Sequence, residues 1–225
     1  MMESIADFGD TCQRSMMARG ISVNTEHVSM SNENEQEIHV GYFYTWWKGD
    51  PLAKLDPVDG FELAATDDVR LLDQLSDLTA EELQDRIDRG NQPYLARIHG
   101  EPAAYGWSAW KRAEIGELAL DFELPERDHY LWDFVTLPDY RGKGIYPHML
   151  QGIIRAELGT AERFWIGHDV DNIASARGIE KAGLPVIGEV WLRNGSPICI
   201  GHQPRERALF VARLLRLPFE MKSQA

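Results

Sequence analysis

The sequence predicts an α/β (α+β) fold with one main domain, and three observations support this prediction. Two pairs of β-prone segments flank turn signals at His99-Gly100 and Asn194-Gly195, a pattern typical of hairpins. Apolar residues recur at helical spacing from Ile145 to Ile154, and a further helix is expected at 172–182. The chain has 225 residues and 44% apolar content, so it is long enough to bury a large core.

The chain is expected to divide into four parts. Residues 1–35 are polar and acidic, and we expect a mobile segment there. Residues 36–60 contain an aromatic, β-prone run, Ile38–Trp47, which is interpreted as an extra strand or an aromatic cap on the core, followed by a loop. The main domain spans 61–202, and residues 203–225 form a closing helix and tail.

The individual elements follow from local signals. Thr79 and Glu82 form a capping box that opens a helix, and Gly90 ends that helix. Short runs rich in aromatic and β-branched residues predict the strands. In chain order, we expect strands at 61–65, 94–98, 103–110, 115–124, 130–137, 164–167, 185–192 and 197–200, and helices at 68–77, 79–89, 145–154, 172–182 and 205–215.

Composition argues against several classes of protein. The net charge of −13 argues against general nucleic-acid binding. The two cysteines, Cys12 and Cys199, provide neither a disulfide framework nor a zinc site, and no metal is expected. The first residues do not have the pattern of a signal peptide, and no apolar run has the length of a membrane span. A cytoplasmic protein is therefore expected.

The most informative stretch is a strand, a basic turn with glycines and a helix. The apolar run Tyr130–Leu137 ends at Pro138-Asp139, and the turn Arg141–Gly144 leads into the helix at Ile145. A helix N-terminus leaves backbone N–H groups unpaired and carries partial positive charge. Glycines allow a close approach of a bound group, and arginine adds charge-assisted hydrogen bonds, so this order suits phosphate. An ordinary turn with solvated basic residues would have the same local pattern.

Residues Arg141–Tyr146 resemble the signature of the GNAT superfamily of N-acetyltransferases, R/Q-x-x-G-x-G/A, except that Tyr146 stands where the family usually has Gly or Ala. A second segment, Asn172–Leu184, is similar to the GNAT segment N-x-x-A-x-x-x-Y-x-K-x-G-F. The two motifs occur in the family's order, 31 residues apart, within a resemblance that covers roughly 61–191. The second segment departs from the family at Ser175, Ile179 and Leu184, which replace Ala, Tyr and Phe.

The resemblance implies a mixed, twisted, mostly antiparallel sheet with splayed central strands and helices on both faces. It also implies acetyl-CoA, or another acyl-CoA, as co-substrate. The pyrophosphate would lie on the backbone of 142–146, and the pantetheine arm would pair with 134–137 as an added strand does. The implied cofactor-binding residues are Phe134, Val135, Thr136, Leu137, Arg141, Gly142, Lys143, Gly144, Ile145, Tyr146 and Asn172.

The implied reaction is direct acyl transfer to an amine, which needs a base for the amine and an acid for the leaving thiolate. The family often supplies the acid from the tyrosine that is here Ile179, so the usual acid is missing, and another side chain or water would carry the proton. We expect Asp133 as the base, Tyr146 as a substitute acid and His168 as a proton relay. Tyr130 is a second substitute acid. Each candidate has a structural alternative: an ion pair for Asp133, a bulky residue that narrows the channel for Tyr146, and packing for His168.

The resulting hypothesis is an acyl-CoA-dependent N-acyltransferase that transfers acetyl from acetyl-CoA to the primary amine of a small molecule in a ternary complex. Two alternatives stay open: a non-catalytic acyl-CoA-binding module, and a transferase that takes its acyl group from acyl carrier protein. The expected partner is a small-molecule amine rather than a nucleic acid or a membrane. A homodimer is a further candidate state.

Overall fold

The computed structural model describes residues 37–115 and 120–223. The expected N-terminal segment, 1–35, lies outside these residues. The described strands are β1 (Glu37–Trp47), β2 (Phe61–Ala65), β3 (Asn91–Ile98), β4 (Glu101–Ala109), β5 (Arg112–Ile115), β6 (Leu120–Glu123), β7 (Asp128–Thr136), β8 (Arg163–Asp169), β9 (Val186–Arg193), β10 (Ser196–Gly201) and β11 (Phe219–Met221). The described α-helices are α2 (Val69–Leu75), α3 (Ala80–Asp88), α4 (Ile145–Glu157), α5 (Ile173–Ala182) and α6 (Arg205–Leu214).

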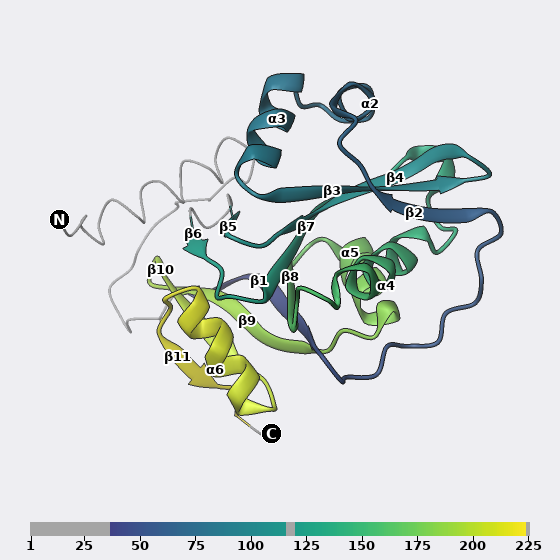
Figure 1. Cartoon of the computed structure of the whole chain (residues 1–225). Helices are drawn as coiled ribbons and strands as arrows, with labels where there is room; N and C mark the ends of the chain where they lie inside the picture. Colours follow the sequence, from purple (N-terminus) through teal and green to yellow (C-terminus); the bar gives the residue numbers. More distant parts are fainter. Residues whose placement is uncertain (1–36, 116–119, 224–225) are drawn as a thin grey trace, which may run out of the picture.

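Nine strands form one large sheet in the order β11-β10-β9-β1-β8-β7-β4-β3-β2, and β5 and β6 form a separate hairpin (Figure 1). Neighbouring strands of the large sheet are antiparallel except for β7 with β8 and β10 with β11. The predicted α/β fold with a mixed, mostly antiparallel sheet is confirmed. No helix in the described part of the chain is long and apolar enough to cross a membrane.

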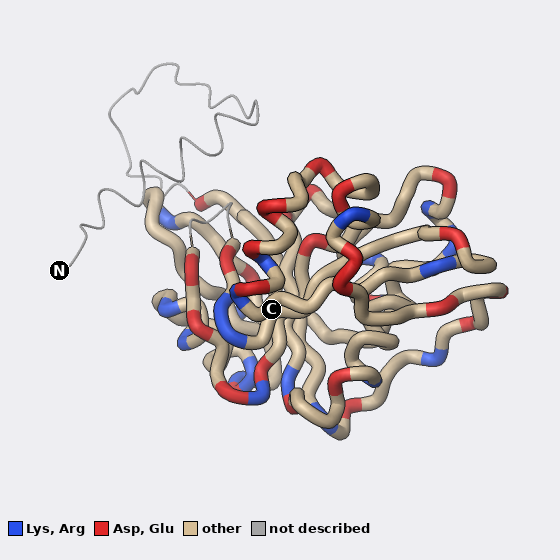
Figure 2. The backbone as a smooth tube through the Cα atoms, turned by 45° about the horizontal axis from the view of Figure 1, so that its top comes forward, with Lys and Arg blue, Asp and Glu red and all other residues tan. Residues whose placement is uncertain are grey.

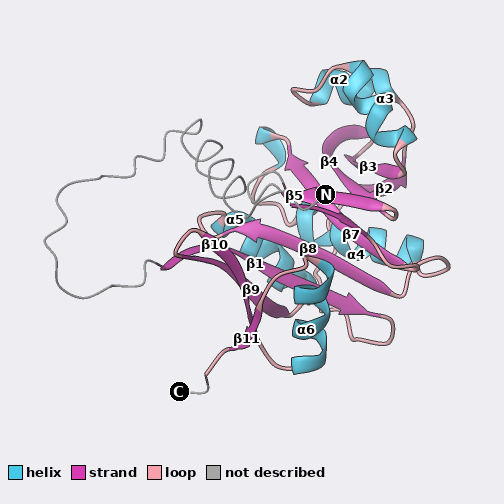
Figure 3. Cartoon of the chain, turned by 90° about the vertical axis from the view of Figure 1, so that its left-hand side faces the viewer, coloured by secondary structure: helices cyan, strands magenta, loops and turns pink. Residues whose placement is uncertain are grey.

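Helices cover both faces of the sheet, as predicted. On one face, α4 and α5 bury side chains such as Leu150 and Ile179 against Phe164 of β8. On the other face, α2 and α3 bury Leu72 and Leu83 against Trp107 of β4, while α6 packs against β9 and β10. Figure 3 shows the strands crossing the molecule with α2 and α3 near one end and α6 near the other. Helices above and below the sheet enclose separate apolar cores.

Strand β1 lies inside the sheet, between β8 and β9, and is antiparallel to both. Its side chains contribute to both cores: Tyr44 and Trp46 pack on the α4–α5 side, whereas Val40 and Phe43 pack on the α6 side. The run predicted as an extra strand or a cap is therefore a central strand. It joins the β9–β10–β11 part of the sheet to the rest.

The central strands β7 and β8 pair only at their N-terminal ends. Residues Asp128–Tyr130 of β7 pair in parallel with residues Arg163–Trp165 of β8. Beyond Tyr130, the described residues show no pairing between the two strands, although β7 continues to Thr136 on the β4 side. The strands therefore diverge toward the start of α4, which confirms the splay that the family resemblance implies.

Helix α4 is anchored to the sheet by a buried carboxylate. Glu157, which is 8% exposed, accepts hydrogen bonds from the hydroxyls of Tyr94 at 3.0 Å and Ser108 at 2.8 Å. Its Oε2 atom also lies 2.7 Å from Nδ1 of His129. Buried polar groups are stable when they are bonded in this way, so the three strands β3, β4 and β7 fix the far end of α4.

Two element predictions are corrected by the structure. The single strand expected at 115–124 is wrong, because β5 and β6 pair antiparallel, with Ile115 opposite Leu120. The run contains one glycine, Gly116, and a glycine within a strand pattern often marks an interruption. Strand β11 was not expected. It pairs with β10 through three residues, too few to give a periodic signal.

Candidate active site

A cavity of about 980 Å³ lies where β7 and β8 diverge. Its walls come from β1, β5, β7, β8 and β9, from Arg86 of α3, from the turn before α4, from the first turn of α4 and from one side of α5. All three predicted catalytic residues, Asp133, Tyr146 and His168, line this one cavity. The splay therefore brings together residues that are up to 35 positions apart in the sequence.

The turn Arg141–Gly144 forms one end of the cavity. Gly142 and Gly144 have φ of +77° and +76°, in the left-handed region that glycine adopts without strain. A Cβ atom built on Gly142 meets no atom within 4 Å, so the backbone there faces open space. Gly144 is the N-cap of α4 and provides no side-chain cap, which leaves backbone N–H groups of the first turn for a ligand. This end fits an anionic group such as pyrophosphate.

Helix α5 contributes polar and cationic side chains to the same end. The Oδ1 atom of Asn172 accepts a hydrogen bond from the backbone N–H of Ser175 at 3.0 Å, so Asn172 caps the helix. Arg177 and Lys181, one turn apart on α5, also line the cavity. Together with Arg141 they give this end a positive character suited to phosphate groups.

Asp133 lies on a bulge of β7. The β4–β7 register shifts between Tyr105 and Trp107, so that two residues of β7, Asp133 and Phe134, face the single residue Gly106. Asp133 has φ of +50°, which is uncommon for a residue with a side chain. Residues with such unusual backbone angles cluster at functional sites. The bulge turns its carboxylate toward α3, where Oδ2 accepts a hydrogen bond from Arg86 at 2.5 Å. The ion pair that sequence analysis left as an alternative for Asp133 is therefore present.

Tyr146 projects from the first turn of α4 toward α5. Its hydroxyl lies 3.2 Å from Oγ of Ser175, and its ring centroid lies 5.2 Å from that of Phe134. A Cβ atom on Gly178 would come within 2.2 Å of the Tyr146 ring, so only glycine fits there. Burial raises the pKa of the Tyr146 hydroxyl, although the hydrogen bond with Ser175 opposes this. The hydroxyl therefore stays protonated at neutral pH.

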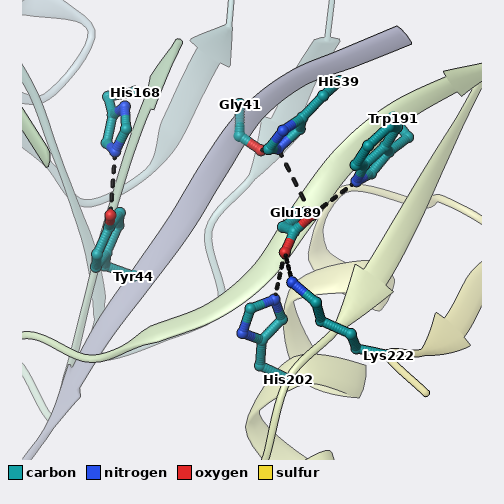
Figure 4. Close-up of polar contacts among 8 residues, drawn as sticks. All are labelled: His39, Gly41, Tyr44, His168, Glu189, Trp191, His202 and Lys222. Carbon is teal, nitrogen blue, oxygen red and sulfur yellow. Dashed lines mark hydrogen bonds and ion pairs between the residues drawn. The ribbon is translucent and has the colours of Figure 1, made fainter. Parts of the chain in front are cut away.

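His168 lies at the end of β8, and both of its ring nitrogens have partners. Its Nδ1 atom lies 2.7 Å from the carbonyl oxygen of Asp169, so Nδ1 carries the proton and donates it. Its Nε2 atom lies 3.1 Å from the hydroxyl of Tyr44, which donates to Nε2 when the ring is neutral (Figure 4). Burial, followed by the charges of Glu180 and Tyr42, raises the pKa of Tyr44 to about 12, so Tyr44 stays protonated. Any proton transfer to Nε2 must therefore displace or pass through this hydroxyl.

Most of the predicted cofactor-binding residues line the cavity, with two exceptions. Leu137 points its backbone N–H at the carbonyl of Ala103, and the Lys143 ammonium lies 5.1 Å from the ring centroid of Tyr140; neither lines the cavity. Tyr130, the other substitute acid, also lines it. The other predicted residues line the cavity, and their role in cofactor binding stays a prediction: Phe134, Val135, Thr136, Arg141, Gly142, Gly144, Ile145, Tyr146 and Asn172.

Sequence reasoning missed several lining residues. Arg177 and Lys181 had a detectable signal, because they follow Asn172 on one helix at a spacing of four. Arg86 and Tyr42 had none, since they come from α3 and β1 and reach the cavity only through tertiary packing.

Comparison with known proteins identifies the family. Residues 60–184, more than half of the chain, match the model of the acetyltransferase (GNAT) family. That family uses acetyl-CoA. A search of curated proteins finds no match.

Similar solved structures include a GNAT-family acetyltransferase from Colwellia psychrerythraea, with 15% identity over 69% of this chain and 56% of that chain, at a TM-score of 0.48. A GCN5-related N-acetyltransferase from Kribbella flavida has 14% identity over 67% of this chain and 56% of that chain, at a TM-score of 0.44. The ribosomal-protein-S18-alanine N-acetyltransferase of Escherichia coli has 14% identity over 55% of this chain and 76% of that chain, at a TM-score of 0.42.

The chain spans just over half the length of the Colwellia and Kribbella proteins. The family model starts at residue 60 and so does not include β1, although β1 lines the cavity. The matched region contains the glycine turn, the splayed strands and Asn172. This chain belongs to the GNAT family of acetyltransferases.

Proposed function

We propose that the protein transfers acetyl from acetyl-CoA to the primary amine of a small molecule, by direct attack in a ternary complex. One observation carries the proposal: the cavity at the splay joins a phosphate-suited glycine turn to a carboxylate, a tyrosine and a histidine. A module that only binds acyl-CoA needs the glycine turn alone. Acyl transfer to an amine also needs side chains that accept and donate protons.

The proposed donor site uses the cationic end of the cavity. The backbone of Gly142 and Gly144 and the first turn of α4 would hold the pyrophosphate, with charge from Arg141. Residues Phe134–Thr136 face the cavity where β8 has diverged, so they suit main-chain pairing with the pantetheine arm. Acetyl-CoA would supply an activated acyl group as a thioester.

In the proposed chemistry, Asp133, Tyr146 and His168 each have a different role in proton transfer. Asp133 accepts the proton of the attacking amine through Oδ1, since Oδ2 is bonded to Arg86. Tyr146, whose hydroxyl is protonated at neutral pH because burial raises its pKa, donates its proton to the leaving thiolate. His168, backed by Tyr44, would relay protons at the other wall. Ile179, where the family often has its acid tyrosine, is fully buried, which supports the assignment to Tyr146.

The experiment that tests the proposal compares turnover with binding in Asp133→Asn. Turnover is followed as thiol released from acetyl-CoA with a panel of small amines, and binding is measured by calorimetry. We expect kcat to fall by about 100-fold or more, while the Kd for acetyl-CoA stays unchanged. Asp139→Asn is the matched control, because Asp139 is exposed on the turn before α4 and does not line the cavity.

Unchanged turnover in Asp133→Asn would remove Asp133 as the base. Binding of acetyl-CoA without thiol release for any amine would instead favour the non-catalytic acyl-CoA-binding module.

A further inference from the structure

Arg86 of α3 lies where two cavities meet. It lines the main cavity and also a second cavity of about 830 Å³, which lies between α3 and the β5–β6 hairpin. Glu114 and Trp132 are the other residues common to both cavities. The guanidinium of Arg86 therefore lies beside both Asp133 and the second cavity.

The Arg86 guanidinium is held in one orientation by its neighbours. It lies over the ring of Trp132, with its Cζ atom 4.4 Å from the centroid, and 5.4 Å from the centroid of Trp107. Its Nη1 atom bonds Asp133. A guanidinium has five N–H donors in a planar fork, so one bond to Asp133 leaves donors for a ligand. The side chains of Arg86 and Asp133 are 22% and 32% exposed, so a molecule in the cavity can touch both.

The position of this ion pair restricts what an acceptor can carry beside its amine. In the proposed reaction, the attacking nitrogen lies near the bulge of β7, next to Asp133. A guanidinium within one ion-pair distance of Asp133 attracts an anionic group close to that nitrogen and repels a second cation. Arginine also matches the geometry of a carboxylate through two parallel hydrogen bonds.

We propose that the acceptor is a zwitterion, an amine with a carboxylate one or two carbon atoms away, and that Arg86 binds the carboxylate while Asp133 receives the ammonium. This inference rests on the proposed acetyltransferase function and specifies its substrate class. On binding, the acceptor replaces one ion pair by two, because its carboxylate takes free N–H donors of Arg86 and its ammonium takes an oxygen of Asp133.

The test uses amino acids and their amides, which have the same shape and amine but differ in one negative charge. Glycine, leucine and phenylalanine are each compared with glycinamide, leucinamide and phenylalaninamide, with acetyl-CoA saturating and at one pH at which the ammonium form of every amine predominates. We expect kcat/KM for at least one acid to exceed that for its amide by about 10-fold or more, the effect of one charge-assisted pair. Arg86→Gln should bring this ratio close to one.

Two variants make the result specific to Arg86. Arg89→Gln removes a guanidinium from the same helix that pairs with Asp85 and lines only the second cavity, so it should keep the wild-type ratio. Arg86→Lys keeps the charge without the fork and should give an intermediate ratio. If Arg86→Gln does not fold, the wild-type and Arg86→Lys ratios decide.

A wild-type ratio of one or below, or turnover confined to amines without a carboxylate, would overturn the zwitterion assignment while leaving the acetyltransferase function intact. A wild-type ratio that persists in Arg86→Gln would overturn the role of Arg86. Failure of the parent function is distinct, because it appears either as absence of acetyl-CoA binding or as binding without thiol release for any amine, whether or not that amine carries a carboxylate.

Discussion

At the scale of single residues, the position of the Tyr146 side chain depends on two neighbours in α5, Ser175 and Gly178. Two departures from the family pattern meet at one ring: Tyr146 itself and Ser175 at its hydroxyl. The ring also needs Gly178, whose missing Cβ provides its space. The two motifs were visible in the sequence, but this coupling was not, because it depends on the approach of α4 to α5.

This coupling predicts the sign of a glycine substitution. In a helix, Gly→Ala ordinarily stabilises by about 0.5–1 kcal/mol. Gly178→Ala should instead destabilise the protein by about 1–3 kcal/mol, because the new methyl group overlaps the Tyr146 ring. In a Tyr146→Ala background the same change should be neutral or stabilising. Urea unfolding of the four proteins in this cycle measures the coupling.

Gly159→Ala is the control for the cycle, because a Cβ there meets no atom within 4 Å and its φ is not in the left-handed region. It should be neutral or slightly stabilising in both backgrounds. Equal effects of Gly178→Ala with and without Tyr146 would show that the ring does not occupy this space.

At the scale of elements, local signals were sufficient where the element is marked at its own ends. The capping box of Thr79 and Glu82, and Gly183 with φ of +92° after α5, were readable in sequence and appear as expected. The turn Asn194-Gly195 joins β9 to β10 with both residues at positive φ, as a two-residue hairpin requires. The placement of β1 between β8 and β9 was not readable, because strand order is set by non-local pairing.

Glu189 ties the strands at the β11 end together. From β9, its carboxylate accepts hydrogen bonds from Nε2 of His202 at 2.6 Å, Nζ of Lys222 at 2.6 Å and Nε1 of Trp191 at 2.9 Å (Figure 4). His39 of β1 lies 3.7 Å away. Burial alone would raise the pKa of Glu189, but the hydrogen bonds from Lys222, Trp191 and His202 together lower it to about 2.

A lowered pKa in the folded state predicts a loss of stability in acid. The ordinary glutamate pKa is 4.5, so the contribution is present above about pH 4.5 and is lost as the pH falls toward 2. We expect roughly 1–3 kcal/mol, less than the full shift implies, because the Lys222 side chain is 56% exposed and solvent screens it. The free energies of unfolding of wild type and Glu189→Gln, measured with urea between pH 6 and 2.5, should converge as the pH falls. A difference between the two free energies of unfolding that does not change with pH would contradict a lowered pKa for Glu189.

At the scale of the whole molecule, the sheet is continuous only because β1 is part of it. Acidic residues outnumber basic ones, 36 to 23, and Figure 2 shows both kinds interspersed along the described chain. The fold class and the glycine turn at one end of the cavity were predictable, since they depend on motifs within contiguous segments. The parts of the two cavities that come from β1, α3 and the β5–β6 hairpin were not predictable, because they meet only through tertiary packing.

This arrangement predicts the effect of removing β1. A chain that starts at residue 48 leaves β8 and β9 without their common neighbour and exposes strand edges that associate readily. We expect it to lose cooperative unfolding and acetyl-CoA binding. A peptide of residues 37–47 added in trans should restore both, as measured by thermal unfolding and calorimetry. Binding of acetyl-CoA by the shortened chain without the peptide would show that β1 is dispensable.

The most direct measurement is a calorimetric titration of the full chain with acetyl-CoA, beside Gly144→Glu and Gly100→Glu. Gly144 and Gly100 both have positive φ, +76° and +86°, but Gly100 lies in the β3–β4 turn, away from the cavity. We predict one-to-one binding by wild type and by Gly100→Glu. Gly144→Glu should lose at least about 10-fold in affinity, because a carboxylate at the turn before α4 repels the phosphate groups. No binding by wild type, or equal binding by Gly144→Glu, would contradict acetyl-CoA recognition at this turn.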